Sequence, residues 1–196
     1  MMTDGQDRRQ LIVAASVQLF ASKGIKSTTV REIAEGAGIL SGSLYHYFDS
    51  KEAIAQEILM GFLEALSSRY AAVLDADLDP AQALRGVVLA SLQLAIEQPD
   101  ATTLYQNELQ YLRESPRFKE VQSTAARAQR AWIEVIERGV ECGIFRSDID
   151  PRLFHRLIRD AVWLSGRGHR GYGEYGTEQL ADAICSVFLE GYATRD

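Results

Sequence analysis

The sequence predicts an all-α protein of about nine helices. Apolar residues recur at helical spacing along nearly the whole 196-residue chain, and no alternating pattern of useful length indicates a strand. The four prolines, at positions 80, 99, 116 and 151, each stand where a helical pattern begins, and the first turn of a helix tolerates proline. A hydrophobic content of 46% is enough for a packed core.

Three helices are predicted in the first quarter of the chain, the second and third of them short. The first covers residues 7–22 and ends at Gly24, because glycine commonly follows the last turn of a helix. The second starts at Thr29, which forms a capping box with Glu32, and it ends at 36–38. The third covers 41–48. Two short helices therefore flank a turn that contains glycine.

Longer helices are expected in the rest of the chain. Asp49 is predicted to cap the fourth helix, with Glu52 at its third position. Further helices are predicted at 79–97, 101–114, 116–143, 151–167 and 177–192. We predict a helix-turn-helix domain over 7–52 and a second, larger helical domain over 53–196.

Two short helices joined by a turn with glycine are typical of a helix-turn-helix. The second helix of such a unit lies in the major groove of DNA, with its first residues at base edges. The stretch GILSGSLYHYFDSKE, residues 38–52, suits that position. Its small residues at 41–43 let the backbone approach DNA, and its aromatic residues can donate to phosphates. The alternative is a helical hairpin over 29–48 that only packs a core, in which Leu44 and Phe48 would be buried in either case.

Residues 28–54, TTVREIAEGAGILSGSLYHYFDSKEAI, resemble the N-terminal domain of the TetR family of bacterial repressors. Where that family often has serine and lysine, this chain has Leu40 and Ser41, which removes a capping serine and a basic phosphate contact and points to a particular operator preference. The resemblance implies a regulator that binds a double-stranded DNA operator. Carried over to this sequence, it places the DNA contacts on Thr28, Thr29, Ser41, Gly42, Ser43, Tyr45, His46 and Lys51.

The charge distribution separates the front of the chain from the remainder. Residues 1–52 carry six basic and six acidic side chains, and the other 144 residues carry 15 basic and 21 acidic ones. An acidic remainder does not bind DNA. The resemblance implies that it holds an effector pocket and a homodimer interface, and two recognition helices one DNA turn apart also require a dimer. The predicted interface residues are Leu157, Ile158, Ala161, Ile184, Val187 and Phe188; the alternative is that these side chains face their own core.

An arginine-rich face is predicted on helix 151–167. Arg152, Arg156, Arg159, Trp163 and Arg167 follow one another at intervals of 4, 3, 4 and 4 residues, which places them on one side of a helix. Solvated arginines paired with acids are one interpretation. The other is a site for an anionic ligand beside the glycine-rich segment 166–176, because arginine binds carboxylates and phosphates and stacks on flat rings. The predicted ligand residues are Trp163, Arg167, Arg127 and Arg130.

The segments AGILSGSLYHYFDSKE and RDAVWLSGR are similar to a subgroup of actinobacterial TetR repressors that control steroid catabolism. That subgroup responds to a coenzyme A thioester of a partly degraded steroid. The resemblance therefore implies an acyl-CoA effector. The alternative is a TetR-type repressor of an efflux or fatty-acid gene set that responds to another hydrophobic ligand.

Other classes of protein find little support in the sequence. No nucleotide-binding, metalloprotease or nucleophile-elbow motif is present, so we expect no enzyme, no cofactor and no metal. Cys142 and Cys185 are far apart and suit small buried side chains. No run of about 18 apolar residues and no signal-peptide core occur, so we expect a cytoplasmic protein without a membrane partner. A constitutive architectural DNA binder would be basic throughout, and activation of transcription stays an alternative to repression.

Overall fold

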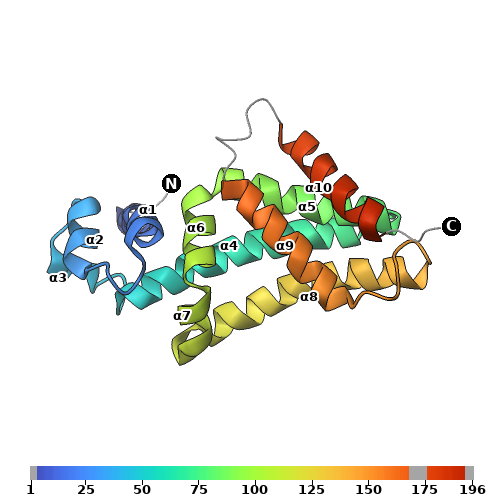
Figure 1. The fold of residues 1–196 in the computed structure, drawn as a ribbon. Helices are drawn as coiled ribbons and strands as arrows, with labels where there is room; N and C mark the ends of the chain where they lie inside the picture. The colour runs from blue at the N-terminus through green and yellow to red at the C-terminus, as the bar shows by residue number, and fades with distance from the viewer. Residues whose placement is uncertain (1–3, 168–175, 193–196) are drawn as a thin grey trace. The chain divides into compact units, whose positions relative to one another are not determined.

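The computed structural model describes residues 4–167 and 176–192, and this part of the chain is helical (Figure 1). The prediction of an all-α fold is confirmed. In order along the chain the elements are α1 (Asp4–Lys23), α2 (Val30–Gly36), α3 (Ser41–Leu44), α4 (Lys51–Leu74), α5 (Pro80–Glu97), α6 (Pro99–Asn107), α7 (Leu109–Glu114), the 3-10 helix η1 (Pro116–Phe118), α8 (Lys119–Glu141), α9 (Pro151–Arg167) and α10 (Thr177–Tyr192). None of these helices is both long and apolar enough to cross a bilayer.

Local signals in the sequence set several of the helix ends. Thr29 accepts a hydrogen bond from the Glu32 amide while the Glu32 carboxylate accepts one from the Thr29 amide, which is the predicted capping box. Lys23 pairs with Glu32, and this hydrogen bond, together with those of the box, lowers the pKa of Glu32 to about 2. Asp79 caps α5 in the same way, with Pro80 in the first turn. Gly24 ends α1 with φ of +82°, a conformation that favours glycine.

Several predicted helix bounds are wrong. The helix predicted over 41–48 is α-helical only from Ser41 to Leu44, and the one predicted from 101 begins at Pro99. The helix predicted over 101–114 is interrupted at Glu108, which has φ of −99° and ψ of 7°. The helix predicted from residue 116 begins with the 3-10 turn η1 and becomes α-helical at Lys119. The first turn of α4 is capped by Ser50 rather than Asp49, because the Ser50 hydroxyl accepts from the Ala53 amide at 3.1 Å.

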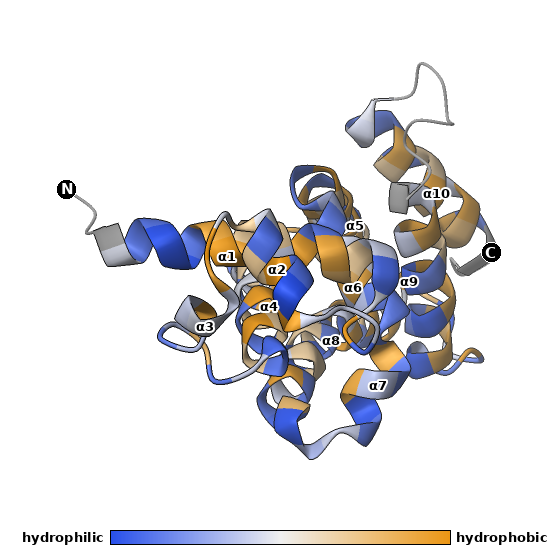
Figure 2. Ribbon diagram, turned by 90° about the vertical axis from the view of Figure 1, so that its left-hand side faces the viewer, coloured by the Kyte–Doolittle hydropathy of each residue, from blue (hydrophilic) through white to orange (hydrophobic). Residues whose placement is uncertain are grey.

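The chain forms two compact units, each built from two segments. The first contains residues 1–63 and 100–123, and the second contains 64–99 and 124–196. In the first unit α1 packs against α2, and α2 packs against α3. Ile12, Phe20, Ile33 and Leu44 are fully buried there. Figure 2 shows that the first turns of α1 are hydrophilic and that hydrophobic residues follow toward its end.

In the second unit α5 packs against both α9 and α10, and three aromatic side chains form a row in its core. The Trp132 ring meets Tyr70 edge-on at 6.2 Å between ring centres and lies 5.6 Å from the His155 ring. The Tyr70 hydroxyl donates to Ser91 Oγ at 2.6 Å, since Ser91 itself donates to the Val87 carbonyl. His155 is 2% exposed, and burial, aided by the nearby Arg159, lowers its pKa to about 4. This core therefore holds a neutral imidazole at physiological pH.

Candidate nucleic-acid interface

The predicted helix-turn-helix is present as two helices joined by a four-residue turn. Gly38 occupies the turn with φ of +67°, and the Ile39 amide donates to the Ala34 carbonyl at 2.9 Å. The next helix, α3, is a single turn that continues as turns through residue 47. Leu44 is fully buried and Phe48 is 4% exposed, so these two side chains fix α3 against the rest of the unit.

Most of the predicted DNA contacts lie on the surface of this segment. Thr29, Ser41, Gly42, Tyr45 and His46 are exposed, and Ser43 is half-buried. Tyr45 is 57% exposed. Small and hydrogen-bonding groups at the starts of α2 and α3 and just after α3 therefore face solvent.

Thr28 is different, and the predicted contact from its side chain is corrected. The residue is 0% exposed, and its hydroxyl donates to the Gly24 carbonyl at 2.8 Å. This hydrogen bond links the two ends of the loop between α1 and α2. The Thr28 hydroxyl thus holds the loop and has no free surface for a phosphate.

Lys51 also contacts the protein itself. Its Nζ donates to the Lys26 carbonyl at 2.8 Å and to the Thr28 carbonyl at 2.7 Å. The lysine thereby ties the start of α4 to the loop that precedes α2. A charged donor that serves two backbone carbonyls stabilises the loop, and this role was not predicted.

We expect Lys51→Met to lower the free energy of unfolding by about 1–2 kcal/mol, because the methionine keeps the aliphatic stem and loses both charge-assisted hydrogen bonds. The salt dependence of operator binding should stay as in the wild type. Denaturant unfolding and a salt titration of operator affinity measure the two quantities. Lys119→Met, at an exposed lysine, is the control. Unchanged stability together with a salt slope lower by about one would instead assign Lys51 to a phosphate.

Arg9 is a structural residue of this unit that the sequence patterns did not indicate. Its Nη1 donates to the Tyr47 carbonyl at 2.7 Å, and its guanidinium pairs with Glu57 and lies 4.0 Å from the centre of the Phe48 ring. One side chain of α1 thus contacts the end of the helix-turn-helix and α4. A single arginine in the polar first half of a helix carries no signal that separates this role from a solvated charge.

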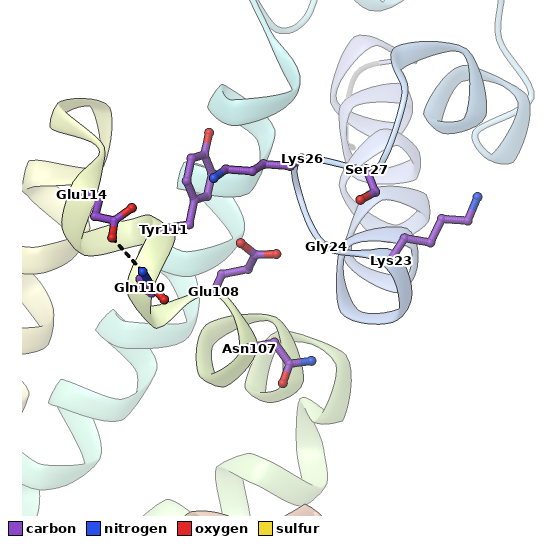
Figure 3. Close-up of a pocket in the computed structure, with 9 residues that line it drawn as sticks. All are labelled: Lys23, Gly24, Lys26, Ser27, Asn107, Glu108, Gln110, Tyr111 and Glu114. Carbon is purple, nitrogen blue, oxygen red and sulfur yellow. Dashed lines mark hydrogen bonds between the residues drawn. The ribbon is translucent and has the colours of Figure 1, made fainter.

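The loop between α1 and α2 borders a polar pocket of about 310 Å³. Figure 3 shows the Glu108 carboxylate directed toward Gly24 and the Lys26 side chain extending to Tyr111. Glu108 Oε1 accepts from the Ile25 amide at 3.1 Å, and Lys26 Nζ lies 4.6 Å from the centre of the Tyr111 ring. A side chain on Gly24 would place Cβ 2.6 Å from Glu108 Oε1. The interruption between α6 and α7 therefore brings a carboxylate against this loop.

The predicted dimer residues divide into three groups by their exposure. Ile158 is 0% and Ile184 8% exposed, so both pack inside their own unit, and their assignment to the interface is corrected. Phe188 is half-buried and meets Phe154 edge-on at 5.9 Å, and Ala161 is half-buried. Leu157 and Val187 are 53% and 73% exposed.

Two further leucines extend the exposed apolar surface of α9. Leu153 is 43% and Leu164 is 68% exposed, and with Leu157 they stand four and seven residues apart, which places them on one side of the helix. We call Leu153, Leu157 and Leu164 the α9 stripe. The apolar residues of α9 form two groups. Ile158 and Val162 are buried within the unit, whereas the α9 stripe is exposed. Periodicity in the sequence shows that these positions are apolar but not which group is buried.

The predicted ligand residues lie on α8 and α9. Arg127 and Arg130 are exposed on α8, and Arg127 donates to Thr124 Oγ1 at 2.9 Å. Trp163 is half-buried on α9. Arg167 ends α9, and its side chain lies outside the described residues, as does segment 168–175 of the glycine-rich loop. Arg159 pairs with Asp160 at 2.7 Å, as the solvated interpretation expects.

A short exposed helix that follows a capped helix and a glycine turn defines a helix-turn-helix regulator. Two family models match the chain: bacterial regulatory proteins of the tetR family over residues 12–58, and the tetracyclin repressor-like C-terminal domain over 77–192. The chain therefore belongs to the TetR family. It is a transcriptional regulator that binds DNA and not an enzyme.

Several relatives resemble the chain over nearly its whole length. The HTH-type transcriptional repressor KstR2 of Mycobacterium tuberculosis H37Rv is 40% identical over 94% of this chain and 92% of its own. KstR2 of Rhodococcus jostii RHA1 is 38% identical over 95% and 92%. The solved structure of the ketosteroid transcriptional regulator KstR2 of M. tuberculosis has a TM-score of 0.85 at 37% identity and covers 96% of both chains.

Proposed function

We propose that this protein is a homodimeric repressor that leaves its operator when a steroid-derived acyl-CoA thioester binds. The observation that carries the proposal is the 40% identity with a KstR2 repressor over 94% of the chain, together with a solved relative described as a ketosteroid regulator. Identity at this level over both family domains supports a shared class of effector.

The exposed residues of the helix-turn-helix support the operator contacts. Thr29, Ser41, Gly42, Ser43, Tyr45 and His46 remain the proposed contact residues. Hydroxyl and phenol groups at this position donate to phosphates, and the small residues allow close approach of the backbone. Blockage of transcription then follows from occupation of the operator.

The α9 stripe and Val187 support the dimer. Exposed apolar side chains that recur along one side of a helix are a surface that association would bury. A twofold dimer would pair the same surface on both subunits and would space two recognition helices for two half-sites.

Trp163 and the arginines support an anionic effector with a flat apolar part. An indole stacks on a fused ring system, and guanidinium groups bind carboxylate or phosphate. An effector releases the repressor only if it binds the conformation that does not bind DNA more tightly than the one that does. Arg167, Arg127 and Arg130 are the proposed partners of its charged groups.

Operator release followed by fluorescence anisotropy tests the effector. We expect steroid-derived acyl-CoA thioesters to release the wild type at lower concentrations than simple fatty acyl-CoA thioesters do. Arg167→Ala should weaken effector binding by about 1.5–3 kcal/mol and leave operator affinity without effector unchanged. Arg156→Ala, at an exposed arginine of the same helix, is the control.

The outcomes separate the alternatives. Release by fatty acyl-CoA thioesters alone would replace the steroid by a fatty-acid effector. If no thioester releases the wild type, the coenzyme A proposal is wrong. An equal response of wild type and Arg167→Ala, and of Trp163→Leu, would keep the effector and remove the proposed site.

A further inference from the structure

Leu40, directly before α3, is the most exposed of the large hydrophobic residues that the structure describes. Its side chain is 79% exposed, more than Val187 at 73% or Leu164 at 68%. Exposed leucines are ordinary when they are scattered. Leu40, however, stands at the start of the helix that faces DNA.

At its position Leu40 makes no side-chain hydrogen bond that would stabilise α3. It is the N-cap residue of α3, with an extended backbone and no hydrogen bond from its side chain to the helix. Serine, threonine, aspartate or asparagine at this position would accept a hydrogen bond from the first turn. The leucine therefore gives up a cap and gains no burial within the chain, so its side chain is free to serve a contact outside it.

Around the start of α3, Leu40 has the most exposed large apolar side chain, since Ile39 before it is half-buried. Ser41 and Gly42 are exposed and small, and a Cβ added at Gly42 would meet no atom within 4 Å. The first residues of a recognition helix approach base edges in the major groove. The apolar group that the bases present in that groove is the C5-methyl group of thymine.

We propose that Leu40 recognises a thymine in each operator half-site through contact with its 5-methyl group. The proposal rests on the DNA-binding function of this family and adds a base and a residue that determine specificity. Loss of one buried methyl group reduces affinity about fourfold. A symmetric operator loses two, so the expected change is about 15-fold.

Replacement of thymine by deoxyuridine tests the contact, because uracil keeps every hydrogen-bonding group and lacks the methyl group. Symmetric pairs of thymines in the operator are replaced one pair at a time, and affinity is measured for wild type, Leu40→Ala and Tyr45→Ala. We expect one pair at which deoxyuridine weakens the wild type about 15-fold and does not weaken Leu40→Ala further. Tyr45→Ala, which lacks an exposed phenol beside the same helix, should keep the full deoxyuridine effect at that pair.

The double-mutant comparison isolates Leu40 from other causes of weaker binding. If the deoxyuridine effect is the same in wild type and Leu40→Ala at every pair, the proposal is overturned. If the wild type binds no operator, the regulator function itself is wrong and the leucine contact falls with it. Leu40→Ser should bind with the affinity of Leu40→Ala and melt at a higher temperature than the wild type, because serine restores the cap; a lower melting temperature would show that leucine supports the fold.

Discussion

A Val187→Arg variant is expected to be a folded monomer whose operator affinity is lower than that of the wild type by a factor of about 10²–10⁴. Val187 is 73% exposed in the single chain, so arginine there has room within the protomer and leaves its core intact. In a dimer that buries this surface, two unpaired guanidinium groups would be brought together and desolvated. A monomer presents one recognition helix and loses the gain in affinity from the second half-site.

Light scattering at micromolar concentration, thermal melting and an operator titration measure the three parts of this expectation. The matched control is Ile96→Arg, which places the same charge at a 41% exposed residue of α5. It should stay dimeric and bind the operator as the wild type does. A dimeric Val187→Arg with full operator affinity would show that the interface lies elsewhere.

The free energy of unfolding of the wild type is expected to fall by up to about 3 kcal/mol as the pH drops from 6.5 to 4. Burial lowers the pKa of His155 to about 4 in the folded chain, whereas the unfolded chain has the ordinary value near 6.5. The unfolded state therefore binds the proton first as the pH falls. His155 thus favours the folded state fully above pH 6.5, and this contribution is lost by about pH 4.

Denaturant unfolding at several pH values checks this expectation, with His155→Phe as the variant because phenylalanine can keep the edge contact with Trp132. The variant should lack the decline between pH 6.5 and 4 and keep the one below it. That lower decline comes from carboxylates such as Glu32, whose pKa is lowered to about 2 and whose stabilising effect is lost only below about pH 4.5. Parallel curves for both proteins from pH 7 to 4 would exclude His155 as the source.

The sequence predicted those helix ends that depend on residues only a few positions apart. The capping box at Thr29, the Asp79–Pro80 start of α5 and the glycine that ends α1 each act within a few residues. Sequence periodicity also placed Leu44 and Phe48 in the core. The short α2 and α3 were predictable because the capping box at Thr29, the glycine turn at Gly38 and the small residues that start α3 lie close together in the sequence.

Contacts between distant segments account for what the sequence did not predict. The interruption at Glu108 coincides with a hydrogen bond to the Ile25 amide, 83 residues earlier. Lys51 was expected at a phosphate because a lysine at a helix start is basic, yet its Nζ reaches the carbonyls of Lys26 and Thr28. Ile158 and Leu157 are adjacent in an apolar pattern, and only packing against other helices decides which one is buried.

The two-segment composition of the first unit limits how hybrid regulators can be assembled from this chain. A hybrid that joins residues 1–52 to another effector-binding body would separate the Ile25 amide from Glu108 and the Lys26 ammonium from Tyr111. Residues 1–63 and 100–123 form one compact unit. A hybrid should therefore take both segments, each replacing the matching segment of the recipient. If residues 1–63 were moved alone, the recipient residue at the position of Glu108 would have to fit against Gly24, where a Cβ would already lie 2.6 Å from the Glu108 carboxylate.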